Sequence, residues 1–111
     1  MDRAVSQAPA SPIVRPALLI GGPAIWTMRA DGSQPRQVTE TGAHGDYFPS
    51  WSPDGQSIAF QRNAPSGARI GIVAAEGGTP RFLAWPGNAY TPVWSPDGDH
   101  LAIAATVGDD E

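Results

Sequence analysis

The sequence predicts an all-β protein built from repeated antiparallel units, and three observations support this fold class. The stretch FPSWSPDGQSIAF, Phe48 to Phe60, recurs as TPVWSPDGDHLAI, Thr91 to Ile103, so that Trp51 and Trp94 lie 43 positions apart, a period typical of repeat architectures. No stretch of the chain shows helical periodicity. The 13 Gly and 12 Pro residues fall mostly in turns spaced as in a many-stranded β protein.

Each copy of the repeated stretch predicts a β-hairpin. In Ser-Pro-Asp-Gly the Pro suits the second position of a type I turn and the Gly supplies a left-handed residue, as in a three-residue hairpin loop with a bulge. The strands that follow, Ile58 to Phe60 and Leu101 to Ile103, place two large apolar side chains on one sheet face and an Ala on the other. We therefore expect both faces to be covered by neighbouring sheets, with the preceding Trp packed between them.

The repeated motif is assigned a structural role. A pattern that is present in every unit serves the fold, and its Asp can accept backbone hydrogen bonds in the turn, so a catalytic Ser/Asp interpretation is not favoured. The motif residues are Pro49, Trp51, Ser52, Pro53, Asp54 and Gly55 in the first copy and Pro92, Trp94, Ser95, Pro96, Asp97 and Gly98 in the second.

A second repeat, with an offset of 45 residues, precedes each motif and consists of a strand, a Gly turn and another strand. It aligns Ile25 to Met28 with Ile70 to Val73, Asp31-Gly32 with Glu76-Gly77, and Pro35 to Thr39 with Pro80 to Ala84. Together the two repeats predict strands at about residues 25–29, 36–39, 48–51, 57–62, 69–74, 81–84, 91–94 and 100–106. Four strands per unit of this length match one blade of a β-propeller.

These strands divide the chain into three predicted regions. Residues 1–16 are rich in Pro, Ala and Ser and are expected to be an irregular lead-in or linker. Residues 17–106 are expected to form propeller blades, with a partial blade at 17–39, a complete blade at 48–84 and a partial blade at 91–106. Within the first of these, Ala17 to Ile20 fits either a short strand or a loop. Residues 107–111 form an acidic tail.

Composition excludes several classes of function. The net charge of −4, with only scattered Arg as basic residues, argues against a nucleic-acid partner. The absence of Cys removes disulfides, thiolate zinc sites and Cys nucleophiles. No apolar run approaches the roughly 20 residues needed to span a bilayer, so membrane insertion is not expected. The amino terminus does not read as a signal peptide, because Pro and Arg interrupt its apolar stretch.

The sequence predicts neither catalysis nor a cofactor. It contains no Gly-x-Ser-x-Gly elbow, Walker loop, Gly-x-Gly-x-x-Gly fingerprint or His-Glu-x-x-His motif. A metal site requires three or four converging ligands, and His44 with Asp46, or Asp97 and Asp99 with His100, provide only weak sets. We therefore expect no metal ion and no enzyme activity in this chain.

The longer loops are the predicted place for a partner. The loops at 40–48, 62–69 and 85–91 are expected on one rim of the sheets, opposite the Ser-Pro-Asp-Gly turns. They carry a mixture of aromatic and polar groups suited to a protein or peptide partner, although solvated loops whose Tyr side chains pack down are the alternative. The residues concerned are His44, Asp46, Tyr47, Arg62, Asn63, Asn88 and Tyr90.

The segment Pro49 to Gly55 with Ile58 to Phe60, and its twin at 92–103, resemble the repeat of TolB-like, WD-repeat-like β-propellers. The resemblance covers about residues 25–106 and includes the turns Asp31-Gly32 and Glu76 to Gly78. It implies a bacterial, non-catalytic propeller module that acts as a protein–protein interaction scaffold. The alternative that it implies is part of the gating propeller of a prolyl oligopeptidase or dipeptidyl peptidase-like serine peptidase, whose catalytic domain would be separate.

The same resemblance bears on location and assembly. TolB proteins are periplasmic, whereas the lack of a signal peptide in this chain leaves a cytoplasmic location open. Members of the family have six to eight blades, so about two blades imply a fragment or an oligomerising piece of a larger propeller. Two blades do not close a ring, and we expect them to leave Ile58, Phe60, Leu101 and Ile103 uncovered. A head-to-tail trimer would supply about six blades and close the ring.

Overall fold

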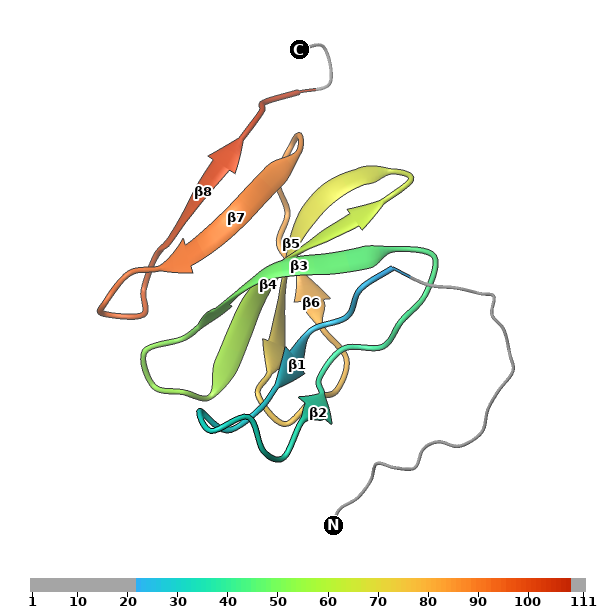
Figure 1. Cartoon of the computed structure of the whole chain (residues 1–111). Helices are drawn as coiled ribbons and strands as arrows, with labels where there is room; N and C mark the ends of the chain where they lie inside the picture. Colours follow the sequence, from blue (N-terminus) through green and yellow to red (C-terminus); the bar gives the residue numbers. More distant parts are fainter. Residues whose placement is uncertain (1–21, 109–111) are drawn as a thin grey trace.

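The computed structural model describes residues 22–108, and every regular element in this part of the chain is a β-strand (Figure 1). In chain order the strands are β1 (Trp26–Thr27), β2 (Arg36–Gln37), β3 (Gly45–Trp51), β4 (Ser57–Ala64), β5 (Gly67–Ala74), β6 (Arg81–Phe82), β7 (Ala89–Trp94) and β8 (Leu101–Ala105). All pairings are antiparallel, which confirms the predicted all-β, antiparallel class. The expected linker at 1–16, the possible strand at Ala17 to Ile20 and residues 109–111 of the acidic tail lie outside the described residues.

The eight strands form three sheets. The middle sheet has four strands in the order β3-β4-β5-β6 and covers most of the segment predicted as one complete unit, 48–84. Strands β1 and β2 form the two-stranded N-terminal sheet, and β7 and β8 form the two-stranded C-terminal sheet. Figure 1 shows the N-terminal and C-terminal sheets on opposite sides of the middle sheet.

The strand ends differ from the predicted ones in two directions. Strand β3 begins at Gly45 instead of 48, and β4 continues to Ala64 instead of 62. In contrast, β1, β2 and β6 have two residues each, fewer than predicted. These three strands lie at sheet edges, where hydrogen bonds form on one side only.

The pairing registers repeat along the chain, as the two sequence offsets suggest. Trp26 pairs with Gln37 between β1 and β2, and Gly71 pairs with Phe82 at the equivalent positions of β5 and β6, 45 residues later. Strands β1 and β2 therefore correspond to β5 and β6, the second half of the middle sheet. Strands β7 and β8 correspond in the same way to its first half, β3 and β4, with an offset of 43 residues.

Strands β3 and β7 share a bulge that the sequence did not reveal. The register of β3 against β4 shifts between Tyr47 and Ser50, and the register of β7 against β8 shifts at the equivalent place. Phe48 and Thr91, which are 43 residues apart, both have a positive φ, of 58° and 49° respectively. Positive φ is uncommon in residues other than Gly, so its recurrence marks the bulge as part of the repeating unit.

The first Ser-Pro-Asp-Gly turn is held by its own side chains. Gly55 has a φ of 74°, as expected, and its N–H donates to the Ser52 carbonyl at 2.9 Å. The Ser52 hydroxyl donates to the Asp54 carboxylate at 2.6 Å and accepts the Ser57 N–H at 3.0 Å. Ser52 and Ser57 close the hairpin, with the Ser57 N–H bonded to the Ser52 hydroxyl instead of the Ser52 carbonyl. The loop therefore has four residues, 53–56, and the prediction of a three-residue loop is wrong.

The second turn, Ser95 to His100, repeats each of these hydrogen bonds, and Gly98 has a φ of 79°. In both turns the pKa of the Asp carboxyl group is lowered below its ordinary value. The largest cause is the hydrogen bond from the Ser hydroxyl, and the second is the hydrogen bond from the backbone N–H of Gln56 or of Asp99. The structural role assigned to the motif is consistent with this self-contained bonding.

Strand β4 is buried on both faces, as predicted for the first copy of the motif. Ile58 and Phe60 are at most 1% exposed and pack with Val73 against Ile25 and Val38, which adjoin β1 and β2. The expectation that Ile58 and Phe60 lack a covering sheet is therefore wrong, because the N-terminal sheet supplies one. On the opposite face Ala59 is fully buried.

The second copy is less covered than the first. Strand β7 lies against β3, β4 and β5 of the middle sheet. Leu101 and Ile103 on β8 are only half-buried and Ala102 is exposed, so the prediction of two-sided burial is wrong for this copy. Within the described residues no further sheet follows β7 and β8, and β8 has a hydrogen-bonded neighbour on one side only, so its side chains are less covered than those of β4.

The two Trp residues of the motif also differ. The Trp94 indole N–H donates to the Ser50 carbonyl at 3.0 Å, so Trp94 lies between the C-terminal and middle sheets as predicted. Trp51, its counterpart on β3, is 54% exposed, which contradicts the prediction for the first copy.

We expect Gly55→Val and Gly98→Val each to lower the free energy of unfolding by about 1 kcal/mol or more, because β-branched residues are strained at positive φ. A Cβ at Gly55 would meet no atom within 4 Å, and one at Gly98 only the Pro53 ring at 3.7 Å, so the two should behave alike. Gly55→Asn is the control and should cost less, because Asn tolerates the left-handed region. Thermal melts measure these costs, and a neutral Val variant would contradict the turn geometry.

We expect Ser52→Ala to raise the pKa of Asp54 towards its ordinary value of 3.8, because the Ser52 hydroxyl is the main cause of the lowering. Because the pKa of Asp54 is lower in the folded than in the unfolded chain, the ionised carboxylate stabilises the fold above pH 3.8. This stabilisation is lost as the pH falls through the pKa of the folded state. Carboxyl ¹³C chemical shifts measured against pH report both Asp54 and Asp97, and Asp97 in the other turn should not change. An unchanged titration of Asp54 would contradict the assigned hydrogen bond.

Candidate functional site

The residues predicted to bind a partner lie at the ends of the strands away from the Ser-Pro-Asp-Gly turns (Figure 1). We call this end of the three sheets the loop rim, made of His44, Asp46, Tyr47, Arg62, Asn63, Asn88 and Tyr90. The loops predicted at 40–48, 62–69 and 85–91 are shorter in the structure, where the strands leave connections of 38–44, 65–66 and 83–88. Most of the rim residues therefore belong to strand ends.

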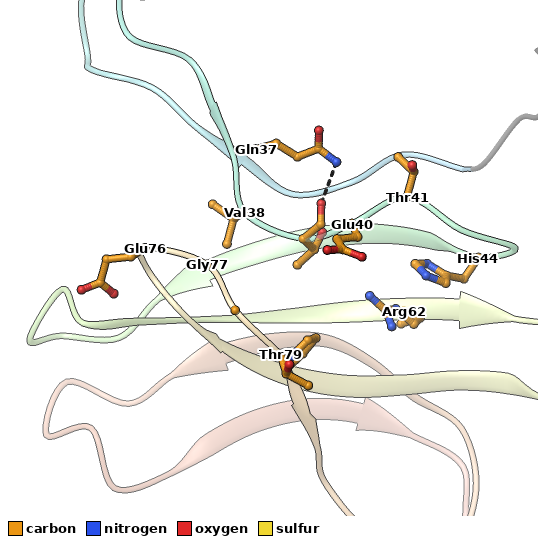
Figure 2. A pocket seen from close by; sticks show the side chains of 12 residues that line it. Gln37, Val38, Glu40, Thr41, His44, Arg62, Glu76, Gly77 and Thr79 are labelled. Atoms are coloured by element: carbon orange, nitrogen blue, oxygen red, sulfur yellow. Dashed lines mark hydrogen bonds between the residues drawn. The ribbon is translucent and has the colours of Figure 1, made fainter. Parts of the chain in front are cut away.

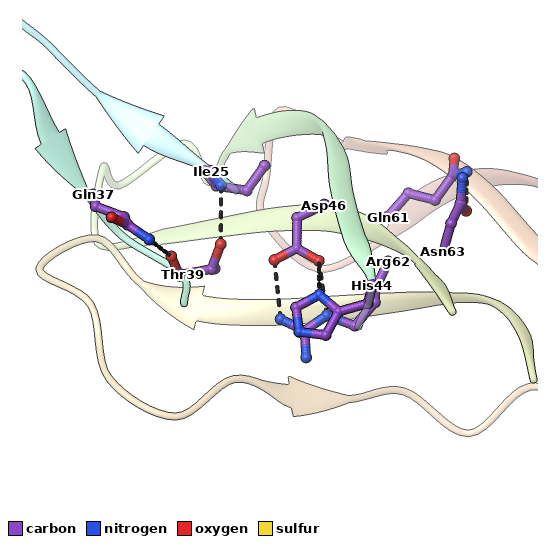
Figure 3. A network of polar contacts seen from close by, with 8 residues as sticks. All are labelled: Ile25, Gln37, Thr39, His44, Asp46, Gln61, Arg62 and Asn63. Atoms are coloured by element: carbon purple, nitrogen blue, oxygen red, sulfur yellow. Dashed lines mark hydrogen bonds and ion pairs between the residues drawn. The ribbon is translucent and has the colours of Figure 1, made fainter. Parts of the chain in front are cut away.

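A buried ion pair lies at the centre of the loop rim (Figure 3). The carboxylate of Asp46, whose side chain is inaccessible to solvent, accepts hydrogen bonds from Nε of Arg62 at 2.7 Å and from Nη2 at 2.9 Å. The Asp46 N–H donates to the Pro23 carbonyl at 2.7 Å, which joins β3 to the start of the N-terminal sheet. Two residues predicted for partner binding therefore bind each other.

Aromatic rings support the guanidinium of Arg62. Its central carbon lies 4.9 Å from the centre of the Phe82 ring and 5.6 Å from that of Phe60. Arg69 lies over the Phe82 ring as well, at 4.4 Å. Cation–π attraction of this kind is stronger where the cation is partly desolvated. The ion pair is thus connected to the hydrophobic core beneath it.

His44 is the third member of this group. Its Nδ1 atom is buried and lies 3.5 Å from Oδ1 of Asp46, without a hydrogen-bond partner among the described residues. Its backbone carbonyl accepts the Gly22 N–H at 3.0 Å. His44, Asp46 and Arg62 are therefore brought together from the connection before β3, from β3 itself and from β4 (Figure 3).

The remaining rim residues are more accessible, although hydrogen bonds fix two of them. Asn63 is exposed, and its side-chain oxygen accepts the Gln61 amide at 2.8 Å. Asn88 is half-buried, and its side-chain oxygen accepts the Ala68 N–H at 2.9 Å. Tyr47 and Tyr90 are half-buried at equivalent positions of β3 and β7.

Gln61 connects the loop-rim residues on the middle sheet with those on β7. It is buried, and while its amide N–H donates to Asn63, its oxygen accepts the Thr91 N–H from β7 at 2.9 Å. Neither Gln61 nor the exposed aromatic Phe48 beside Tyr47 was identified from the sequence as a site residue. Nothing in the sequence indicates this role of Gln61, because it depends on β7 lying against the middle sheet in the folded chain.

A polar cleft of about 660 Å³ opens between the N-terminal sheet and the turn from β5 to β6 (Figure 2). Figure 2 shows Glu40, His44 and Arg62 towards one end of the cleft and Glu76 towards the other. The sequence did not predict this cleft, because its two walls, 37–41 and 76–80, come from segments about 40 residues apart. The Arg36 guanidinium donates to the Glu76 carbonyl and so ties the two walls together.

The motif Ser residues form hydrogen bonds within their own turns. In each turn the Ser hydroxyl donates to the neighbouring Asp carboxylate, at 2.6 Å from Ser52 and 2.5 Å from Ser95. The same hydroxyls accept the backbone N–H of Ser57 and of His100, respectively. These contacts support the turns.

We expect Asp46→Ala and Arg62→Ala each to lower the free energy of unfolding by about 3 kcal/mol, because each leaves the opposite charge buried without a partner. The double variant should lose less than the sum of the two single losses. Ser66→Ala, at an exposed residue of the turn between β4 and β5, is the control and should stay within about 0.5 kcal/mol of the original protein. Urea denaturation measures all four, and additive single losses would show that the pair is not coupled.

Comparisons with known proteins add no assignment, since no protein-family model matches the chain and no curated protein matches it. The described part of the chain contains no helix long and apolar enough to cross a membrane. Residues 22–108 also contain no group of three or more His, Asp or Glu side chains placed to hold a metal ion. Any functional assignment therefore depends on the geometry of the sheets and of the loop rim.

Proposed function

We propose that this chain is a non-catalytic β-propeller module, similar to TolB-like repeats, that binds a protein or peptide at its loop rim. The observation that carries the proposal is the recurrence of strand register and bulge in consecutive sheets, 43 to 45 residues apart. Repeat proteins of this kind stack equivalent units and use the loops at one end for binding.

The loop rim suits a binding surface because its accessible groups stand on a rigid base. Asn63 is exposed, and Tyr47 and Tyr90 are half-buried, with polar ends suited to the edge of an interface. The Asp46 and Arg62 pair holds β3 to β4 beneath them. A side chain that is already fixed loses less entropy when a partner binds.

A second copy of the chain is the other partner that we propose. Among residues 22–108, the N-terminal and C-terminal sheets have two strands each, where the middle sheet has four. This contact would use sheet edges, whereas a peptide would use the loop rim, so the two kinds of binding do not compete for the same residues.

The test is a selection of peptides from a random phage-displayed library on the purified 111-residue protein. We expect selected peptides to lose at least tenfold in affinity on Asn63→Arg and Tyr90→Ser, because these changes alter the loop rim. The control Gln34→Arg changes an exposed residue in the turn between β1 and β2, away from the loop rim, and should bind unchanged. Melting curves verify that each variant is folded.

Two outcomes would contradict the proposal. Peptides that bind the rim variants as well as the original protein would place the binding surface elsewhere. Hydrolysis of chromogenic dipeptide substrates by the isolated chain would instead favour the peptidase interpretation, in which these blades belong to an enzyme.

A further inference from the structure

In the part of the chain that the structure describes, strands β8 and β1 each have a free edge where the middle sheet has a pairing. Within residues 22–108, β8 pairs only with β7 and β1 pairs only with β2. Their counterparts β4 and β5 pair with each other along their whole length, from Ser57 with Ala74 to Ala64 with Gly67. Such free edges present unpaired N–H and C=O groups that can recruit a further strand.

We infer that the free edge of β8 pairs antiparallel with β1 of another copy of this chain, a conclusion that rests on the proposed repeat module. The register follows from the middle sheet, where Ile58 is opposite Val73. Offsets of 43 and 45 residues convert this pair into Leu101 opposite Met28 of the partner subunit. The next pair on the same face is Ile103 opposite Trp26 of the partner subunit.

The paired side chains are apolar on both strands and are accessible in the single chain. Trp26 is 55% exposed and Met28 is 66% exposed. Leu101 and Ile103 are half-buried, although their counterparts in the middle sheet are fully buried. Pairing would remove these four side chains from water, which favours association.

The sizes of the side chains are also complementary. In the middle sheet Gly71 lies between Phe60 and Phe82, and a Cβ on Gly71 would be 2.7 Å from the first ring and 2.8 Å from the second. The equivalent row in the composite sheet is Ile103, then Trp26 and Gln37 of the partner subunit. The row in the middle sheet thus has a Gly between two Phe residues, and the composite row has a Trp between an Ile and a Gln. The total side-chain volume of the two rows is therefore similar.

The same pairing provides a partner for the exposed Trp51. The Trp94 indole donates to the Ser50 carbonyl of the preceding sheet. In the assembly, the sheet that precedes the middle sheet also contains β7 of the neighbouring copy. The Trp51 indole would therefore donate to the carbonyl of the partner's Val93, the counterpart of Ser50. Both Trp51 and Val93 are exposed in the single chain.

The contact is head-to-tail, so association continues until a ring closes. The described residues of each copy supply eight strands, enough for two four-stranded sheets. Three copies would give about six sheets, within the range of roughly four to eight known for closed propellers. The expected particle therefore has three times the 11.6 kDa mass of the chain.

Single-Cys variants test the pairing without background, because the chain contains no Cys. Ala102→Cys and Thr27→Cys, at positions predicted to lie opposite each other, are refolded together and oxidised. We expect a disulfide-linked dimer in the mixture and none in either variant alone. Ile103→Cys mixed with Trp26→Cys is a second pair, because neighbouring antiparallel pairs alternate in separation and the closer pair suits a disulfide better.

Matched controls distinguish this register from other contacts. Ala102→Cys mixed with Met28→Cys should give no disulfide, because Met28 lies on the opposite face from Thr27. Ile103→Lys should abolish the assembly seen by light scattering, whereas Val107→Lys, at a residue that is 70% exposed and lies beyond β8, should leave it unchanged. The Trp51 indole N–H should exchange with solvent at least tenfold more slowly in the assembly than in Ile103→Lys.

Three results would overturn the inference: a folded monomer without cross-links, a disulfide in Ala102→Cys alone, or cross-linking of Ala102→Cys with Met28→Cys. The inference and the proposed function fail separately. Cross-links in the expected register without peptide binding would contradict the binding function only. Rim-dependent peptide binding by a monomer would contradict the strand pairing only.

Discussion

The burial of β4 on both faces is the constraint on which the rest of the structure depends. Ile58 and Phe60 face the N-terminal sheet, while Ala59 and Gln61 face β7, and all four are at most 4% exposed. Burial of a large apolar side chain contributes about 1.5 to 3 kcal/mol. A single four-stranded sheet cannot bury both of its faces, so the middle sheet requires a neighbour on each side.

A polar contact accompanies the apolar packing on each face of β4. On one face Arg62 binds Asp46 and rests on the rings of Phe60 and Phe82. On the other face Gln61 bonds to Asn63 and to the backbone of Thr91. Buried polar groups need their partners, so these contacts are satisfied in one arrangement of the strands and not in one shifted by a residue.

The sequence was sufficient to place all eight strands, because two independent offsets located the same units twice. It was not sufficient to find the ion pair, because Asp46 and Arg62 meet only through the bulge. If the register of Trp51 with Ile58 continued unbroken, Asp46 would be opposite Asn63. The bulge depends on the positive φ of Phe48, a residue type that gives no signal of such a conformation. The polar cleft was missed for a similar reason, since its walls meet only in the folded chain.

The repeating hydrogen-bond pattern has a consequence for how such a chain can change in length. The strand pairings within the sheets recur 43 to 45 residues later, so no point in the cycle is a privileged start or end. An in-frame tandem duplication of one period therefore inserts a whole sheet wherever in the gene it begins, and a deletion of one period removes a whole sheet. Recombination need not occur at a unit boundary to leave each remaining strand with its proper neighbour.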